Sequence, residues 1–368
     1  MRIERAELRA IALPLLHPFE TSFGVEHEKH CLILSLHCEG VTGWGECVAM
    51  SGPWYSEETT GTAWHILAEF LLPQVLGASL DSAEDLLSRL ARVRGNNMAR
   101  AAVEGAFLDA LARSRNISLS EMLGGVLPEI PSGVSIGIQS SPSDLVATVE
   151  RELQANYRRV KLKIRPGADL EYVREVRRRF PDTQIMVDAN SAYQATDASH
   201  LCGLDEYGLT MIEQPLAHDD IVDHAILARQ LTTPLCLDES IHSTEDARKA
   251  LNLGSCRVIN IKSGRMGGLT ESVRTHDLCR DRGVPVWCGG MLETNIGRAH
   301  NVALASLPNF TLPGDVSASE RYFAEDIAFP NFELTSAGTI PVPSGPGIGV
   351  EVDASRLAQV TLRREEFR

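Results

Sequence analysis

The chain has 368 residues, of which 43% are hydrophobic and 23% charged, and its formal net charge is −14. This composition is that of an ordinary soluble globular protein, and the length is sufficient for a barrel with an accessory domain. The acidic balance argues against nucleic acid or an anionic membrane as a partner, because both require a basic surface.

The eight cysteines form no C-x-x-C pair, and several lie in apolar, strand-like runs. We therefore expect small buried hydrophobes in a reducing compartment rather than disulfides or a zinc site. The first apolar run is short and broken by Pro14, so it fits neither a signal peptide nor a membrane span. These features predict a cytoplasmic protein.

Residues 1–125 are predicted to form an α+β capping domain, because short strand-like runs are followed by apolar residues at helical spacing. Strands are predicted at Ile3–Leu13, Leu32–His37 and Thr42–Val48, and helices at Glu57–Leu72, Ser82–Val93 and Met98–Arg113. The segment Phe19–Gly24, which is rich in Thr, Ser and Gly, is predicted to be a loop.

Residues 126–320 alternate short apolar runs with helix-length amphipathic segments such as Asp169–Arg179 and Ser243–Leu253, the pattern of a parallel sheet wrapped by helices. The runs are Val134–Ile138, Val160–Ile164, Ile185–Asp188, Leu209–Glu213, Leu235–Asp238, Val258–Lys262 and Val284–Cys288, with Phe310–Pro313 as a weaker eighth. Seven or eight such units in roughly 190 residues favour an α/β fold of the (β/α)-barrel type over an open sheet. The tail, residues 321–368, is predicted to return to the capping domain.

Five of the predicted barrel strands carry one ionisable residue each, at a nearly constant interval. They are Lys163, Asp188, Glu213, Asp238 and Lys262, which are separated by 25, 25, 25 and 24 residues. The interval is the length of one βα unit, so each charge marks the same point of its unit. In a barrel this point is the C-terminal end of the strand, where active sites are built.

Strand alternation places these charges on one side of the sheet. Lys161 and Lys163 share a face that is opposite to the aliphatic residues of their strand, and Asp188 shares its face with Asn190. Three carboxylates that converge at a barrel mouth require cations, because buried charges are costly unless they are paired or bound to a metal.

A ligand set of oxygen atoms alone favours Mg²⁺, or Mn²⁺ in its place, over Zn²⁺. Asp188, Glu213 and Asp238 would hold the ion, which would stabilise the charge that a substrate carboxylate gains when it loses its α-proton. Lys163 and Lys262 would act as base and acid from the two faces of the substrate. For any single one of these residues a salt bridge or a strand-end hydrogen bond is the simpler interpretation, but the shared period and face across five strands favour a site.

These residues resemble the enolase superfamily, in its muconate-lactonising subgroup. The matching motifs are K-x-K at 161–163, the Asp188-Ala-Asn run, Ile212-Glu-Gln-Pro215, Leu237-Asp-Glu-Ser240 and Asn260-Ile-Lys262. Within the subgroup, strings such as Phe19-Glu-Thr-Ser-Phe-Gly24 and Trp287-Cys-Gly-Gly-Met-Leu-Glu-Thr294 are similar to o-succinylbenzoate synthases that also racemise N-succinyl or N-acyl amino acids. The resemblance covers essentially the whole chain.

This resemblance implies roles for individual residues. Lys163 and Lys262 would be the catalytic pair, and Asp188, Glu213 and Asp238 the Mg²⁺ ligands. Lys161 would lie beside the substrate carboxylate, and Arg265 matches an arginine of the racemase-competent branch. Further substrate-binding positions would be Phe19, Met50, Tyr55, Asn190, Leu292 and Phe323. The implied protein acts on a small-molecule carboxylate, belongs with menaquinone biosynthesis if it is a synthase, and forms a homo-oligomer.

Asn295 departs from the pattern of relatives, which commonly have glycine there, and we expect its side chain to narrow the pocket or alter the backbone. A muconate cycloisomerase remains an alternative. A dipeptide epimerase fits less well, because it would carry a D-x-D pair near the eighth strand where this chain has Gly314-Asp-Val-Ser317. A non-catalytic barrel used for binding is the alternative outside enzymes, and it would be expected to lack some of the five charged residues, all of which are present.

Overall fold

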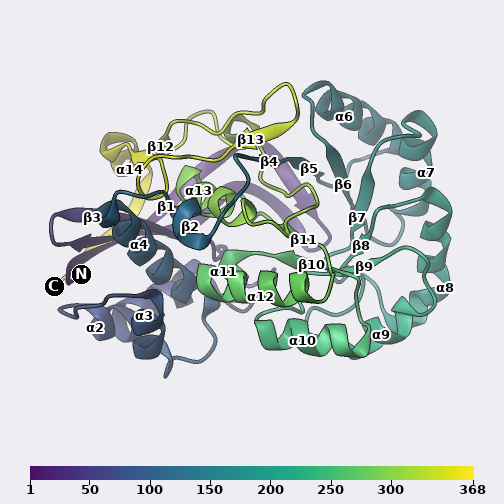
Figure 1. Cartoon of the computed structure of the whole chain (residues 1–368). Helices are drawn as coiled ribbons and strands as arrows, with labels where there is room; N and C mark the ends of the chain where they lie inside the picture. Colours follow the sequence, from purple (N-terminus) through teal and green to yellow (C-terminus); the bar gives the residue numbers. More distant parts are fainter.

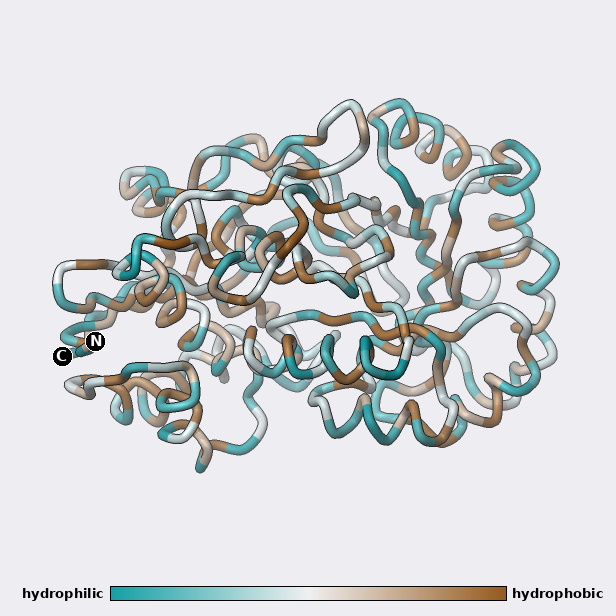
Figure 2. Tube along the Cα trace, in the orientation of Figure 1, coloured by the Kyte–Doolittle hydropathy of each residue, from teal (hydrophilic) through white to brown (hydrophobic).

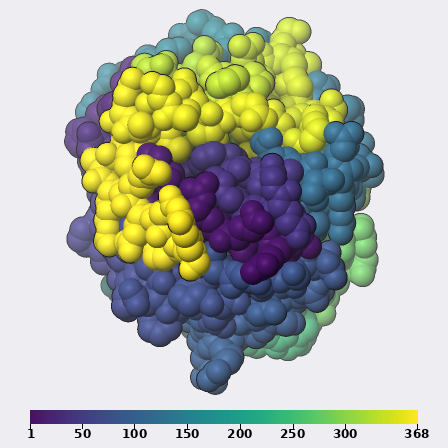
Figure 3. Space-filling model, turned by 90° about the vertical axis from the view of Figure 1, so that its left-hand side faces the viewer, coloured from purple at the N-terminus to yellow at the C-terminus, as the bar shows by residue number.

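The capping sheet is built from both ends of the chain. In the computed structural model, which describes residues 1–368, four antiparallel strands lie in the order β15-β1-β2-β3. Their bounds are β1 Ile3–Thr21, β2 Gly24–Cys38, β3 Val41–Cys47 and β15 Thr361–Phe367. Figure 3 shows the two ends of the chain side by side on one face of the molecule. The tail therefore does pair with the N-terminal strand, while the domain boundaries at residues 125 and 320 stay predictions.

Helices cover one face of this sheet and enclose its apolar core. They are α1 Thr60–Ile66, α2 Leu72–Val75, α3 Ala83–Leu90 and α4 Asn97–Arg115, followed by α5 Leu119–Leu123. A π-helical turn, Leu67–Leu71, joins α1 to α2. Strand β3 packs so closely on α4 that a Cβ atom at Gly43 would lie 2.0 Å from the carbonyl oxygen of Ala106, which explains the glycine. The three predicted helices are confirmed to within a few residues.

The prediction of a loop at Phe19–Gly24 is wrong. Strand β1 continues to Thr21, which pairs with Gly24, so only Ser22 and Phe23 form the turn of a long hairpin. Contacts distant in sequence explain the difference, because the hairpin lies against the barrel. The amide of Ile138 donates to the carbonyl of Glu20 at 3.0 Å, and the Ser22 hydroxyl donates to the carbonyl of Asn190 at 3.0 Å.

Seven consecutive parallel strands form the second sheet (Figure 1). They are β5 Gly133–Ile136, β6 Arg159–Lys163, β7 Ile185–Asp188, β8 Ile212–Glu213, β9 Leu235–Leu237, β10 Val258–Ile261 and β11 Val286–Cys288. The predicted eighth strand does not form a ladder. Instead, residues 310–314 make single parallel bridges, Val286 to Phe310 on one side and Ser132 to Gly314 on the other. The fold is thus the predicted modified (β/α)-barrel with a capping domain.

Helices wrap the outside of this barrel. They are α6 Pro142–Gln154, α7 Leu170–Arg179, α8 Ala198–Leu201, α9 Val222–Ala228, α10 Thr244–Leu253, α11 Ser263–Met266, α12 Leu269–Asp281 and α13 Asn295–Ala305. Figure 2 shows hydrophilic and hydrophobic residues alternating along α10 and α12, as expected of helices with one buried face. The final helix is α14 Ala354–Val360. Two small antiparallel sheets complete the fold. One pairs β4 Glu129–Pro131 with β13 Thr339–Pro341, and the other pairs β12 Ala328–Phe329 with β14 Glu351–Val352.

An apolar layer fills the barrel directly below the charged residues. It consists of Met186, Met211, Cys236, Val258 and Trp287. The first three of these precede Asp188, Glu213 and Asp238 by two positions, so each shares a strand face with the charge that follows it. This layer closes the interior and leaves the charged ends of the strands as the floor of an open mouth. All eight cysteines are free, and no helix is both long and apolar enough to cross a membrane.

Candidate active site

The charged repeat converges at the C-terminal ends of the barrel strands. Strand register places Lys163 opposite Asp188 and Asp188 opposite Glu213. The Nζ atom of Lys163 lies 2.6 Å from Asp188 Oδ2, and the Nζ atom of Lys161 lies 3.1 Å from Asp188 and 3.0 Å from Glu213. These side chains are buried, so their charges act on one another with little screening by water.

Lys262 forms a second ion-paired group on the far side of the carboxylates. It follows strand β10, and its Nζ atom lies 2.7 Å from Asp238 Oδ2 and 3.1 Å from the Tyr55 hydroxyl. Three strands, β7 to β9, separate it from β6, which carries Lys163. The structure thus brings both predicted catalytic amines to one mouth from different strands.

The surroundings shift the pKa values of Lys163 and Lys262 in opposite directions. Burial lowers the pKa of Lys163 below its ordinary value, and the nearby Asp188 only partly opposes this effect. Burial acts in the same direction on Lys262, but Tyr55 and Glu239 outweigh it and raise the pKa of Lys262. Burial likewise raises the pKa of Glu213, and the neighbouring carboxylate of Asp188 adds to this. Two carboxylates held this close to each other favour a cation between them.

The three proposed metal ligands do not converge on one point. No group of three Asp, Glu, His or Cys side chains has the arrangement of ligands to one ion. Asp188 and Glu213 share the Lys161 ammonium, whereas Asp238 is turned toward Lys262, Arg265 and Tyr55. The donor set still suits a hard cation, because the donors are carboxylate oxygens and the buried Oδ1 of Asn260 and Oε2 of Glu239 nearby have no hydrogen-bond partner. The three-carboxylate metal site therefore stays a prediction.

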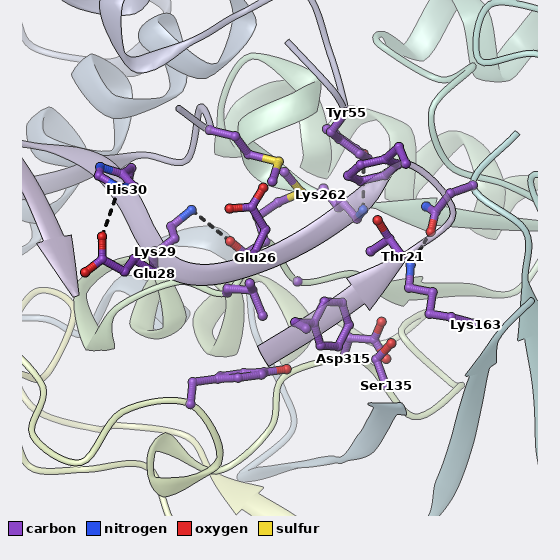
Figure 4. A pocket seen from close by; sticks show the side chains of 18 of the residues that line it. Thr21, Glu26, Glu28, Lys29, His30, Tyr55, Ser135, Lys163, Lys262 and Asp315 are labelled. Atoms are coloured by element: carbon purple, nitrogen blue, oxygen red, sulfur yellow. Dashed lines mark hydrogen bonds and ion pairs between the residues drawn. The ribbon is translucent and has the colours of Figure 1, made fainter. Parts of the chain in front are cut away.

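A pocket lies between these strand ends and the capping domain (Figure 4). It holds about 780 Å³ of space that protein atoms do not fill, part of it open to solvent. The predicted residues that line it are Phe19, Met50, Tyr55, Lys161, Lys163, Asn190, Lys262 and Leu292. Two of these have a left-handed backbone, Asn190 with φ +41° and Leu292 with φ +57°, a strain that often accompanies function.

Three residues predicted to shape the pocket do not reach it. Arg265 is buried beneath it and donates hydrogen bonds to Asp238 and to the carbonyl oxygens of Ile241 and Asn260. Phe323 belongs to the hydrophobic core, and its neighbour Tyr322 lines the pocket in its place. Asn295 is fully buried at the start of α13, so our expectation that it narrows the pocket is wrong.

Asn295 instead ties α13 to the C-terminal segment. Its Nδ2 group donates to the carbonyl of Ala328 at 2.7 Å and to Asn331 Oδ1 at 2.9 Å, and its Oδ1 atom accepts from the Ser319 hydroxyl at 2.6 Å. A glycine could make none of these bonds, so the asparagine acts on the packing of the tail.

Several pocket residues were missed from the sequence. Most lie on the long hairpin or in the segment after it: Thr21, Phe23, Glu26, Glu28, Lys29, His30 and Ser51. The barrel adds Ser135 and Asp315, and the wall after β11 adds Gly290 and Met291. Asp315 had a usable signal in its spacing, because it follows the predicted eighth strand much as the other charges follow theirs. Thr21, Phe23, Gly290 and Met291 lie within the family-like strings Phe19–Gly24 and Trp287–Thr294, which also marked them.

Comparison with known proteins identifies the family. Residues 144–356 match the family described as "Enolase C-terminal domain-like", and residues 6–124 match "Mandelate racemase / muconate lactonizing enzyme, N-terminal domain". The chain belongs to the enolase superfamily. This superfamily member is 54% identical to an o-succinylbenzoate synthase of Geobacillus kaustophilus over 98% of its own length and 96% of that protein.

Other relatives of this enolase-superfamily chain agree with that match. An N-succinylamino acid racemase of Thermus thermophilus is 50% identical, with 98% of each chain covered. A chloromuconate cycloisomerase of Pseudomonas putida is more distant, at 26% over 98% of this chain and 99% of the relative. A solved structure of an enolase-superfamily member from Listeria innocua superposes with a TM-score of 0.96 at 44% identity, over 100% of this chain and 99% of that one. At such identity and coverage, this superfamily member is an enzyme.

Proposed function

We propose that the protein removes the α-proton of a carboxylate substrate and acts as an o-succinylbenzoate synthase, an N-succinylamino acid racemase, or both. The observation that carries this proposal is the placement of two lysine amines in one pocket. Lys163 at the end of β6 and Lys262 after β10 both line it, with the carboxylate-bearing strands between them. Amines at two sides of a bound α-carbon can remove a proton from one face and return it to the other.

In the racemase reaction, one lysine accepts the α-proton at Nζ and the other donates a proton to the opposite face. The roles exchange when the other enantiomer binds. In the synthase reaction, Lys163 takes the α-proton, hydroxide leaves from the β-carbon, and Lys262 stays protonated beside the negative charge that has developed on the substrate. The two reactions use the same lysines, so one pocket supports both.

Asp188, Glu213 and Asp238 would hold Mg²⁺, with Mn²⁺ as a substitute, if Asp238 turns from Lys262 toward the other two carboxylates. When bound, the ion supplies positive charge against the added negative charge on the substrate carboxylate. Lys161, which already lies between Asp188 and Glu213, is placed to accompany that carboxylate. Arg265 would act through Asp238, to which it donates, rather than through the substrate.

The substrate would be enclosed by Phe19, Met50, Tyr55, Asn190 and Leu292, with Tyr322 in the role first expected for Phe323. The proposal also includes four further points: the only partner is a small carboxylate, the protein is cytoplasmic, it forms a homo-oligomer, and as a synthase it takes part in menaquinone biosynthesis.

The alternatives are less well supported. A dipeptide epimerase would need free acidic groups near residue 315 for a substrate amine, but Asp315 is already ion-paired with Arg159 and Lys161. The second position of that pair is Ser317, whose hydroxyl donates to the carbonyl of Gly133 at 3.3 Å. Muconate cycloisomerase would share the lysines, and only turnover of muconate would favour it.

The test is exchange of the substrate α-proton in D₂O, followed by nuclear magnetic resonance with N-succinyl and N-acyl amino acids. We expect exchange that EDTA abolishes and added Mg²⁺ restores, together with dehydration in the synthase assay. The double variant Lys163→Ala, Lys262→Ala serves as the control, because any exchange that it shows does not depend on the two lysines. Absence of both exchange and dehydration in the wild type would refute the proposal.

A further inference from the structure

The lysines of this chain are concentrated in a single place. Among 35 basic residues only five are lysines, at positions 29, 161, 163, 249 and 262. Four of the five line the active-site pocket, and only Lys249 on α10 lies elsewhere. Three of the four belong to the barrel and are used by the proposed reaction. Lys29, on strand β2 of the capping sheet, has no role in it.

Lys29 is the pocket lysine whose charge no carboxylate contacts. Lys161, Lys163 and Lys262 each lie within 3.1 Å of at least one carboxylate oxygen. The Lys29 side chain is only 4% exposed, and it has no ion pair within 4.0 Å. Its Nζ atom donates to two backbone carbonyls, Met291 at 2.9 Å and Val48 at 3.2 Å. An ammonium group has three donors, so one remains for a ligand.

Nearby carboxylates do not satisfy this charge. Burial raises the pKa of the Glu46 carboxyl to about 7, and the charge of Lys29 only partly opposes this. No ion pair joins the two side chains, and Glu46 accepts from Thr294 and from the amide of Gly297 instead. Glu26 and Glu28 lie at the partly exposed rim of the pocket, where water screens them, and Glu28 lies 3.5 Å from His30. Charge interactions are stronger in the buried interior than at such a rim, so the buried ammonium of Lys29 acts more strongly on an anion at the inner wall than Glu26 and Glu28 do.

Lys29 and the barrel lysines face the pocket from different ends. Figure 4 shows Lys29 on the capping strand and Lys163 on the barrel toward opposite sides of the view, with Lys262 between them. A ligand with two carboxylates can therefore place the reacting one at the barrel and the other at the capping sheet.

We infer that Lys29 binds the second carboxylate of the substrate and selects dicarboxylic, succinyl-type substrates over those with a neutral acyl group. The inference rests on the proposed function and deepens it. Lys29 also holds the pocket wall by donating to the carbonyl of Met291. The experiment must therefore distinguish this structural role from the recognition of an anion.

The experiment compares N-succinyl with N-butyryl derivatives of one amino acid, which have acyl chains of four carbons and differ in the terminal carboxylate. The readouts are kcat/KM for α-proton exchange and equilibrium binding by calorimetry. We expect the wild type to prefer the succinyl compound at least about 10-fold. Lys29→Met should lower kcat/KM and affinity for it by roughly 10- to 100-fold, the worth of a charge-assisted hydrogen bond, while the butyryl compound changes by less than about 3-fold.

The controls separate the possible outcomes. Lys29→Arg should retain the preference because it keeps the charge, and Lys249→Met should change nothing. Equal loss for both compounds in Lys29→Met, or a wild type without preference, overturns the inference. If Lys29→Met does not fold, the same comparison of succinyl and butyryl compounds is made with Lys29→Gln, and its result together with the preference of the wild type decides whether the inference holds. If no proton exchanges but succinyl-selective binding depends on Lys29, the proposed function fails and the inference survives.

Discussion

The ammonium of Lys161 lies 2.6 Å from Asp315 Oδ2, although Asp315 belongs to a segment that forms no strand of the barrel. The other carboxylate oxygen of Asp315 lies 2.8 Å from Arg159. Both cations also lie over the Trp287 ring, Arg159 at 5.1 Å and Lys161 at 4.9 Å from its centroid. Asp315 thus holds Lys161, which is proposed to accompany the substrate carboxylate, and we expect Asp315 to act as a positioning residue.

Asp315→Asn should destabilise the protein and weaken catalysis. Two buried cations would lose a charged partner, which costs about 3 kcal/mol in the free energy of unfolding. Urea denaturation measures this loss, and kcat/KM should fall because Lys161 is no longer fixed. The control is Glu351→Gln, which removes an exposed partner of Arg113 and should cost less than about 1 kcal/mol. Equal stability of the two variants would contradict the assigned role.

The same carboxylate should make stability depend on acidity. Burial opposes ionisation of Asp315, but Lys161 and Arg159 outweigh it and lower its pKa from 3.8 to about 2. A lowered pKa in the folded state means that the stabilisation is complete above about pH 4 and is lost as pH falls toward 2. The difference in stability between wild type and Asp315→Asn should therefore shrink by about 2 kcal/mol across this window. A difference that is constant with pH would refute the ion pairs.

Lys163→Ala and Lys262→Ala should each abolish racemisation while the fold is kept. Each variant lacks the amine on one face of the α-carbon, so the rate should fall by about 100-fold or more. Circular dichroism checks the fold, and polarimetry follows the racemisation. Lys249→Ala removes an exposed lysine and serves as the matched control. A fully active Lys163 or Lys262 variant would exclude the two-base mechanism.

Glu213→Gln should weaken Mg²⁺ binding. The substitution replaces a charged oxygen donor by a neutral amide at nearly constant volume, and we expect the affinity to fall at least about 10-fold. Calorimetric titration with Mg²⁺ measures it. Glu245→Gln, on the exposed face of α10, should leave the affinity unchanged. If Glu213→Gln binds Mg²⁺ as the wild type does, Glu213 is not a ligand.

Asn295→Ala should reduce stability and leave substrate preference intact. The change removes two buried hydrogen bonds, to Ala328 and Ser319, and a partly buried one to Asn331. The loss of the buried partners should cost about 1–3 kcal/mol. Thermal denaturation and the succinyl-to-butyryl ratio of kcat/KM are the two measurements. A shift in the ratio without loss of stability would restore the specificity role that the sequence suggested.

The barrel and its charged mouth were predictable because they depend on local regularities. A βα unit of nearly constant length repeats the same strand end every 25 residues, and strand alternation assigns each charge to a face. Lys163, Asp188 and Glu213 could therefore be predicted to meet from their spacing alone, and register confirms that they do.

The sequence by itself thus determined the fold class and the charged residues at the barrel mouth, because periodicity and strand alternation depend on neighbouring residues. The strand Thr361–Phe367, by which the tail joins the capping sheet, was visible only in the structure. The tertiary structure alone decided the opposite wall of the pocket. Lys29 meets the carbonyl of Met291, 262 residues away, and no local pattern encodes that contact. The tertiary structure also decided that Tyr322 faces the pocket while its neighbour Phe323 packs in the core, because the surrounding surfaces determine which of two adjacent side chains is buried. In the same way, it decided that Asn295 is buried against the C-terminal segment.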